Sequence, residues 1–242
     1  MKCALISDIH GNLEALEAVL KDIDDRKVDV IHCLGDVVGY GCNPAECLEL
    51  VLSRCKIRLM GNHEFAALGL LQSGYLNDIA EQSLAWTAKQ LTEDDLASIA
   101  DFEMDATIEN AYLVHASPYE PDQWHYILSV DEALQGFGQF AQPLGFFGHT
   151  HVPHLFSLGP DGTCHMRAGH DFDLDDEKRY LVNVGSVGQP RDNDPRACYA
   201  VYDSEGQQIM LRRVEYDIEL TQSKMAQAKL PALLFERLEV GR

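Results

Sequence analysis

The sequence predicts an α/β fold that changes to α+β in its second half. Two observations carry this prediction. Three units of apolar strand, polar loop and helix follow one another between Cys3 and Phe65, and strand-like runs dominate beyond Tyr112. Consecutive units of this kind place strands side by side with helices packed outside them. Because 242 residues without a long low-complexity tract fit one core, we expect a single domain over residues 1–242.

The three units of the first half share one layout. Strands are predicted at residues 3–6, 28–34 and 57–60, each followed by a polar loop. Asn12 is predicted to cap the first helix, whose apolar residues recur three or four positions apart. Asn43-Pro44 opens the second helix, since proline is favoured in the first helical turn.

The segment of about 65–100 is predicted to be a helical insertion. Asn77 or Asp78 opens one helix, and Thr92 with Asp95 resembles a capping box at the start of the next. Two interpretations stay open. The amphipathic pattern is typical of a packing layer. A long excursion between strands can also form a cap over a site, and Tyr75 and Trp86 would then be its aromatic contacts.

The second half is rich in predicted strands. They fall at residues 111–114, 145–147, 155–158, 164–168, 180–184, 197–202 and 209–214. Gly159-Pro160-Asp161-Gly162 and Ser204-Glu205-Gly206 are predicted hairpin turns. These strands suggest a second, mainly antiparallel sheet. The tail of about 218–240 has helical periodicity broken at Pro231, which predicts two short C-terminal helices.

Composition excludes several classes of protein. The formal net charge is -20, from 39 acidic and 19 basic residues, which disfavours nonspecific nucleic-acid binding. The seven cysteines are odd in number and contain no Cys-x-x-Cys pair, so we expect reduced thiols. The N-terminus lacks a signal-peptide core, and no apolar run approaches the roughly 18 residues of a membrane span. We therefore expect a soluble, cytoplasmic protein that binds no membrane.

Five short polar blocks interrupt the apolar runs and hold the candidate metal ligands. The blocks are Ser7-Asp8-Ile9-His10-Gly11-Asn12, Gly35-Asp36, Gly61-Asn62-His63-Glu64, Val114-His115 and Gly148-His149-Thr150-His151. Asp8 and His10 lie two apart on what we predict to be an extended strand end, so both side chains point to one side and one cation can bind both. His149 and His151 repeat this spacing after a later strand.

Three further residues complete the candidate ligands. Asp36 ends the second strand, where each carboxylate oxygen can bind one of two cations. His115 supplies another imidazole, and Asn62 supplies a carbonyl oxygen and an amide donor. Half of the ten histidines fall in these blocks, which favours a metal site over chance. The remaining histidines are interpreted as structural or surface groups, with His125 a weaker candidate for substrate contact: His32, His125, His154, His165 and His170.

These blocks resemble the calcineurin-like metallophosphoesterase superfamily, and their spacing resembles its small bacterial and archaeal phosphodiesterase branch. The segment Asn183-Val184-Gly185-Ser186-Val187-Gly188-Gln189-Pro190-Arg191 resembles a late loop of that branch. The resemblance implies a β-sandwich of two mixed sheets flanked by α-helices, with the metals at the strand ends. Protein phosphatases of the superfamily carry Asp-Arg after the bridging aspartate. This chain has Val37-Val38 after Asp36, which disfavours protein phosphatase activity.

The resemblance also implies two overlapping ligand sets. The first metal is expected between Asp8, His10, Asp36 and His151, and the second between Asp36, Asn62, His115 and His149. Mixed nitrogen and oxygen ligands suit Mn, Fe, Zn or Ni better than Mg or Ca, and Mn is the first expectation. Two such cations can hold a bridging hydroxide that attacks a phosphate ester.

Residues around the ligands are expected to bind and protonate the substrate. His63, next to Asn62, is the expected general acid. Glu64 either orients His63 or caps the following helix. Arg191 either holds a substrate phosphate or forms a surface salt bridge. Asn12 is a further candidate for substrate binding.

The sequence therefore predicts a metallophosphoesterase that hydrolyses phosphodiesters or phosphomonoesters. Its expected partner is a small phosphate-ester substrate, and a homo-oligomer is compatible with the sequence. Two alternatives remain at this point. One is a hydrolase of dinucleoside polyphosphates or nucleotides, and the other is a non-catalytic scaffold with the same fold.

Overall fold

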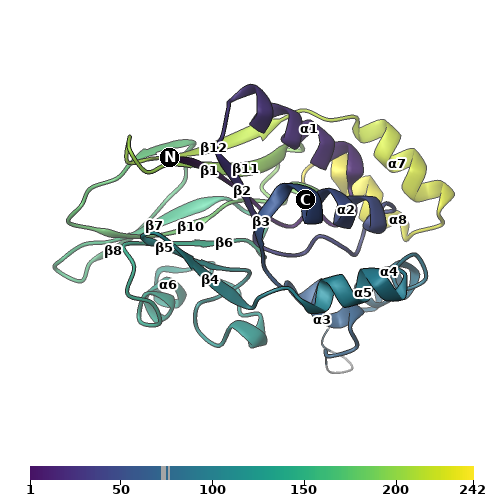
Figure 1. The fold of residues 1–242 in the computed structure, drawn as a ribbon, viewed down its shortest axis with the longest axis horizontal. Helices are drawn as coiled ribbons and strands as arrows, with labels where there is room; N and C mark the ends of the chain where they lie inside the picture. Colours follow the sequence, from purple (N-terminus) through teal and green to yellow (C-terminus); the bar gives the residue numbers. More distant parts are fainter. Residues whose placement is uncertain (72–74, 76) are drawn as a thin grey trace.

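A computed structural model describes residues 1–71, 75 and 77–242, and it contains two six-stranded sheets with helices outside them (Figure 1). The strands are β1 (Lys2–Ile6), β2 (Val30–Cys33), β3 (Cys55–Arg58), β4 (Asp105–Ile108), β5 (Ala111–Val114), β6 (Leu144–Phe147), β7 (His154–Leu158), β8 (Cys164–Arg167), β9 (Asp171–Asp173), β10 (Arg179–Asn183), β11 (Ala197–Asp203) and β12 (Gln208–Val214).

The helices lie mainly on the outer faces of the sheets. They are α1 (Leu13–Asp25), α2 (Pro44–Arg54), α3 (Asn62–Ala67), α4 (Asp78–Thr87), α5 (Glu93–Ala100), α6 (Val130–Phe137), α7 (Ile218–Gln227) and α8 (Ala232–Glu236), with short 3-10 turns η1 (Pro121–Gln123) and η2 (Arg237–Glu239). None of the helices in the described part of the chain combines the length and the apolar character that crossing a bilayer requires.

Both sheets are mixed, as predicted. The first has the order β3-β2-β1-β11-β12-β9, with β1, β2 and β3 parallel and the other pairings antiparallel. The second has the order β4-β5-β6-β10-β7-β8, with β5, β6 and β10 parallel. Each sheet therefore gathers the carboxyl ends of three parallel strands at one edge, where polar loops can meet.

The core is divided by the sheets into layers, and β1 shows the division. Cys3 and Leu5 face the second sheet, whereas Ala4 and Ile6 pack against α1 and α2. Because side chains alternate across a strand, a strand buried on both faces must be apolar throughout, which explains the continuous apolar runs in the sequence. On the far side of the second sheet, Phe137 of α6 packs in a separate apolar cluster.

The structure corrects the predicted grouping of strands. The strands predicted at 197–202 and 209–214 form β11 and β12, and they join the first sheet because β11 pairs antiparallel with β1. In the second sheet, three of the five pairings are antiparallel, which agrees with the predicted mainly antiparallel sheet. The sequence also missed the short edge strands β4 and β9, which are mostly exposed and carry polar residues. Both predicted hairpin turns are present, between β7 and β8 and between β11 and β12.

The predicted helical insertion and tail pack together. Asn77 caps α4, and Thr92 with Asp95 forms the predicted capping box of α5. Pro231 separates α7 from α8 as predicted. Trp86 of α4 packs against an apolar cluster of the C-terminal helices. Residues 72–74 and 76 of the predicted insertion lie outside the described residues.

Candidate metal centre

The polar loops that follow β1, β2 and β6 hold their side chains through an unusual backbone. Asp8, His10, Asp36, His149 and His151 all have positive φ, at 54°, 50°, 53°, 63° and 60°. The prediction that Asp8 and His10 lie on extended backbone is therefore wrong. The same prediction for His149 and His151 is also wrong. Such residues cost about 1 to 3 kcal/mol each and cluster at functional sites. The left-handed turns, rather than strand alternation, aim these side chains at one place.

Hydrogen bonds between the loops hold this backbone in place. The main-chain N–H groups of Asp8 and His10 donate to the carbonyls of Gly35 and Asp36, at 3.0 and 2.9 Å. The parallel pairing of β1 and β2 thus continues past the strands. The carboxylate of Asp8 accepts from the N–H of His149 at 3.0 Å, which joins the second sheet to the first.

The first ligand group contains Asp8, His10 and His151, all buried. Nε2 of His151 lies 3.3 Å from Oδ1 of Asp8, and Nε2 of His10 lies 3.1 Å from Nε2 of His151. Nδ1 of His151 lies 2.6 Å from the Gln189 carbonyl, and Nδ1 of His10 lies 3.3 Å from the Val38 carbonyl. Since a carbonyl accepts only from a protonated Nδ1, each Nε2 presents a lone pair inward, as metal-binding histidines do.

The second ligand group contains Asp36, His115 and His149. Nε2 of His115 lies 3.4 Å from Oδ2 of Asp36, and Nδ1 of His115 lies 2.8 Å from the Leu34 carbonyl. The same Asp36 oxygen lies 3.7 Å from Nε2 of His10. Asp36 therefore stands between the two groups. Asn62 begins α3 and is buried.

The atoms of the two groups fit divalent cations. Within the described residues, three ligand atoms expected around the second cation are buried without a hydrogen-bond partner: Oδ1 of Asn62 and Nε2 of His115 and of His149. A buried polar atom without a partner costs about 1 to 3 kcal/mol unless something binds it. Imidazole nitrogens with carboxylate and amide oxygens are ligands of Mn, Fe, Zn and Ni.

Burial and the charges of neighbouring groups set the protonation of these side chains. Burial lowers the pKa of His149 to about 3, and repulsion from His115 adds to this effect. Burial alone would lower the pKa of His115, but the carboxylate of Asp36 outweighs it and raises the value to about 9. Burial would raise the pKa of Asp36, yet His115 and His63 hold it well below the usual range. The carboxylate is thus ionised and ready for a cation.

His63 lies beside the first ligand group. Its ring is 4.7 Å from the ring of His10 and 4.4 Å from that of Tyr40. Nδ1 of His63 is buried without a partner among the described residues. Burial lowers the pKa of His63 to about 4 despite the attraction of Asp36. The imidazole is therefore neutral at pH 7.

Glu64 holds the loop that carries Asp36. Its carboxylate accepts four main-chain N–H groups, from Asp36 at 2.7 Å, Val37 at 2.8 Å, Val38 at 3.0 Å and Gly61 at 3.0 Å. Of the two interpretations of Glu64, the structure shows the cap, and the cap extends to the Asp36 loop. Burial beside Asp36 raises the pKa of Glu64 to about 7, while the four donors favour its ionised form.

The two substrate candidates differ in their surroundings. Nη2 of Arg191 donates to Oε1 of Gln189 at 2.8 Å, and the guanidinium lies 5.9 Å from the Tyr40 ring. No carboxylate pairs with Arg191 among the described residues, so the salt-bridge alternative is not seen. Asn12 instead has a structural place: its amide donates to Gly188 and its oxygen caps α1. Both polar atoms of the Asn12 amide thus form hydrogen bonds within the protein, and we propose no substrate contact for it.

Two aromatic residues of the centre were missed from the sequence. Trp124 is buried with its ring 6.0 Å from that of His115, and Tyr126 stacks on His149 at 4.4 Å and 25°. They come from the segment between β5 and α6, which has neither periodicity nor a motif. His125, between them, is exposed and lies against Tyr119 and Glu120.

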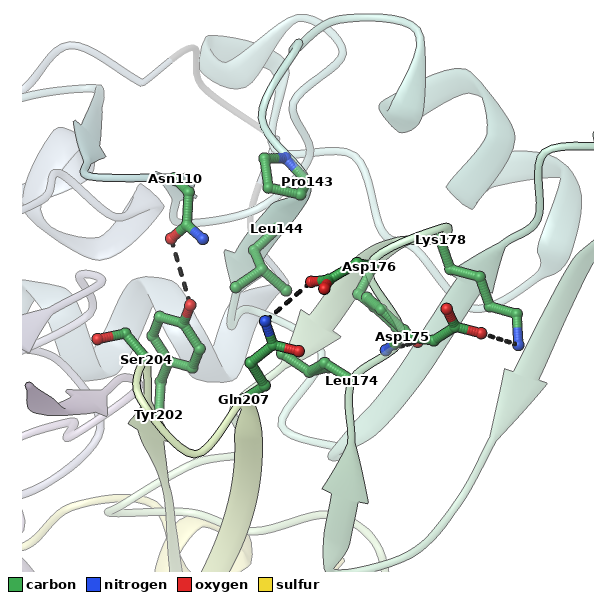
Figure 2. Close-up of a pocket in the computed structure, with 11 residues that line it drawn as sticks. Asn110, Pro143, Leu144, Leu174, Asp175, Asp176, Lys178, Tyr202, Ser204 and Gln207 are labelled. Atoms are coloured by element: carbon green, nitrogen blue, oxygen red, sulfur yellow. Dashed lines mark hydrogen bonds and ion pairs between the residues drawn. The ribbon is translucent and has the colours of Figure 1, made fainter.

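A recess lies where β5 and β12 begin (Figure 2). It is lined by Asn110, which precedes β5, and by Gln207, which precedes β12, whereas His115 follows the far end of β5. Its polar groups bind one another: Tyr202 donates to Asn110 at 3.2 Å, and Gln207 donates to Asp176 at 2.9 Å (Figure 2). This recess is therefore separate from the candidate metal centre.

The family of the chain follows from comparison with known proteins. The family model described as the calcineurin-like phosphoesterase superfamily domain matches residues 1–207. The chain belongs to this superfamily. An uncharacterized protein of Methanocaldococcus jannaschii is 39% identical to this phosphoesterase in an alignment of 245 positions, which covers 99% of this chain and 98% of the relative.

Solved structures agree with this membership. A metallophosphoesterase from Sphaerobacter thermophilus has a TM-score of 0.87 and 40% identity, and the match covers 100% of this chain and 99% of that one. A hypothetical protein from Pyrococcus horikoshii has a TM-score of 0.79 at 18% identity, over 100% and 98% of the two chains, and shares the fold. This phosphoesterase is thus a hydrolase of phosphoric esters from a metal-dependent superfamily.

Proposed function

We propose that this phosphoesterase hydrolyses phosphodiesters or phosphomonoesters at a centre of two divalent cations, with Mn the first expectation and Fe, Zn or Ni as alternatives. Asp8, His10, Asp36 and His151 would hold the first cation, and Asp36, Asn62, His115 and His149 the second. The observation that carries the proposal is the position of Asp36, whose Oδ2 lies 3.7 Å from His10 and 3.4 Å from His115.

Such a pair of cations, when bound, activates a water near neutral pH and neutralises the charge on the phosphoryl oxygens. Side chains of the protein would donate the proton and hold the substrate. His63 is the proposed general acid, because its unpartnered Nδ1 lies beside the first ligand group. To act as a general acid, His63 would have to hold a proton in the complex with substrate, where the negative phosphoryl group favours the protonated imidazole. Arg191 would hold a phosphoryl oxygen, since no carboxylate occupies it in the described structure.

We also propose that the insertion of about 65–100 caps the centre within one domain of residues 1–242. Oγ of Ser83 in α4 accepts the N–H of Tyr40 at 2.6 Å, and Tyr40 lies against His63. The hydroxyl of Tyr75 donates to the Gln123 carbonyl at 2.9 Å. The insertion thus touches two loops that border the centre.

The decisive experiment is hydrolysis of bis(p-nitrophenyl) phosphate and p-nitrophenyl phosphate by protein stripped with EDTA and reloaded. We expect turnover of at least one ester that is restored by Mn and not by Mg. Absence of turnover with Mn, Fe, Zn and Ni alike would favour the non-catalytic scaffold. A reloaded Asp36→Asn variant serves as the control for contaminating phosphatase.

A further inference from the structure

The segment between β5 and α6 lies directly against the second ligand group. Trp124 is buried, and the planes of its ring and of the His115 ring are 67° apart. Tyr126, two residues later, stacks on His149 with the ring planes 25° apart, and 49% of its surface is exposed. One face of the Tyr126 ring is therefore covered by a candidate ligand, while much of the side chain is open to solvent.

Tyr126 also forms one wall of a recess of about 560 Å³. The recess is lined by Ser117, Tyr119, Glu120, His125, Tyr126, Glu132 and Gln135. Its second aromatic wall is the stacked pair of Tyr119 and His125, whose ring centres are 5.7 Å apart. Nε2 of His125 lies 3.1 Å from Oε2 of Glu120. The rim of the recess therefore carries the Glu120 carboxylate, whose remaining oxygen lone pairs can accept hydrogen bonds.

These walls select a kind of ligand. Exposed aromatic surface gains free energy when a flat ring covers it, and stacking of a base on an aromatic side chain contributes about 1 to 3 kcal/mol. The carboxylate of Glu120 favours groups that donate hydrogen bonds, and the negative charges of Glu120 and Glu132 repel a second phosphate. Oε2 of Glu132 already accepts the N–H groups of Leu128 and Ser129, at 2.7 and 2.8 Å. The recess begins at Tyr126, so a ring bound there would adjoin a phosphoryl group at the second ligand group.

We propose that Tyr126 and this recess form a subsite for a flat aromatic group with hydrogen-bond donors, as in an amino-bearing nucleobase, attached to the phosphoryl group of the substrate. This proposal rests on the proposed function, because it places the phosphoryl group at the metal centre. It narrows the substrate class to esters in which a nucleoside or similar aromatic group lies near the phosphate.

The test uses two ligands that differ only in the base: adenosine 5′-monophosphate and ribose 5-phosphate. Their affinities for the Mn-loaded protein are measured by calorimetry, or their kcat/KM values are compared if they are turned over. We expect the nucleotide to be preferred about tenfold or more. Tyr126→Ala should bring the preference within about twofold, while Tyr126→Phe should retain it.

Two further variants distinguish binding of the aromatic group by the recess from packing of Tyr126 on His149. Tyr119→Ala, which changes the recess wall without touching the candidate ligands, should reduce the preference in part. Leu128→Ala, exposed on the same segment and outside the recess, should leave it unchanged. Metal content is measured for every variant.

A wild-type preference near one would overturn the subsite. So would a Tyr126→Ala variant that loses metal and both affinities equally, because Tyr126 would then only support His149. Failure of the proposed function is a different result, namely absence of ester hydrolysis by the wild type, and the calorimetric preference can be measured whether or not hydrolysis occurs.

Discussion

The main-chain N–H of Asp36 donates to the buried carboxylate of Glu64 at 2.7 Å. Three more N–H groups, including that of Gly61 at 3.0 Å, converge on the same carboxylate. One side chain at the start of α3 thus fixes the loops that follow β2 and β3. Because Asp36 has left-handed backbone, it needs this support to stay in position.

Glu64→Gln should destabilise the protein and weaken metal binding. The new amide group would face N–H donors, leaving buried donors unpaired at a cost of about 2 to 4 kcal/mol. Urea unfolding and metal analysis test this. Asp95→Asn changes the capping box of the exposed helix α5 and should cost about 1 kcal/mol or less without loss of metal. Equal effects of the two substitutions would contradict the role given to Glu64.

His63→Ala should lower kcat by about 10² to 10⁴ while the metal content stays at the wild-type level, as expected for loss of a general acid. The loss should be larger for a diester with a phenol leaving group than for one with p-nitrophenol, because the more basic phenolate depends more on protonation. Rates with the two esters and metal analysis of the same samples check this. Equal losses with both esters would remove His63 from proton transfer.

Substitutions at two glycines can disturb His63, the proposed general acid, and Asp36, the proposed bridging ligand, separately. A Cβ at Gly39 would lie 2.1 Å from Nδ1 of His63, and a Cβ at Gly61 would lie 2.1 Å from Oδ1 of Asp36. Gly39→Ala should therefore reduce turnover with metal retained, whereas Gly61→Ala should reduce metal content. Gly162→Ala is the control, since its φ is +81° but nothing lies within 4 Å. Wild-type turnover in Gly39→Ala would show that His63 has no part in the reaction.

Acid sensitivity is expected from His154, which is not a candidate ligand. It is buried, and neither ring nitrogen has a hydrogen-bond partner within the described residues. Burial lowers its pKa from 6.5 to about 4. Between these values the unfolded chain binds the proton more strongly, so the free energy of unfolding falls as the pH falls, by about 2 kcal/mol from pH 7 to pH 5.

His154→Phe should remove this part of the pH dependence of the free energy of unfolding. The new ring should still pack against Phe147 and Phe156. Urea unfolding at pH 7 and pH 5 measures the difference between the variant and the wild type, in which the titration of all other groups cancels. The same pH dependence in both proteins would show that His154 is not the group responsible.

The sequence located the polar blocks whose side chains the structure brings together, because these blocks come after apolar strands, and apolar strands are easy to recognise. It could not predict how Asp8 and His10 converge, since positive φ at residues other than glycine leaves no mark on composition. The partners of β11 and β12 were missed for a related reason. β1 is apolar on both faces, and nothing in its sequence says which strand lies beside it.

The remaining gaps concern contacts between distant segments. Tyr126 reaches His149 only because two loops meet in three dimensions, and no spacing in the sequence encodes that contact. Glu64 had two interpretations because its place next to His63 is local, while the donors near Asp36 lie 26 to 28 residues away.

Metal analysis combined with anomalous diffraction would establish whether the Asp36 carboxylate lies between two cations. We predict two divalent cations per chain, each bonded to the Asp36 carboxylate, and a fall to one or none in Asp36→Asn. A wild-type protein that binds a single cation, or two cations neither of which touches Asp36, would contradict the account.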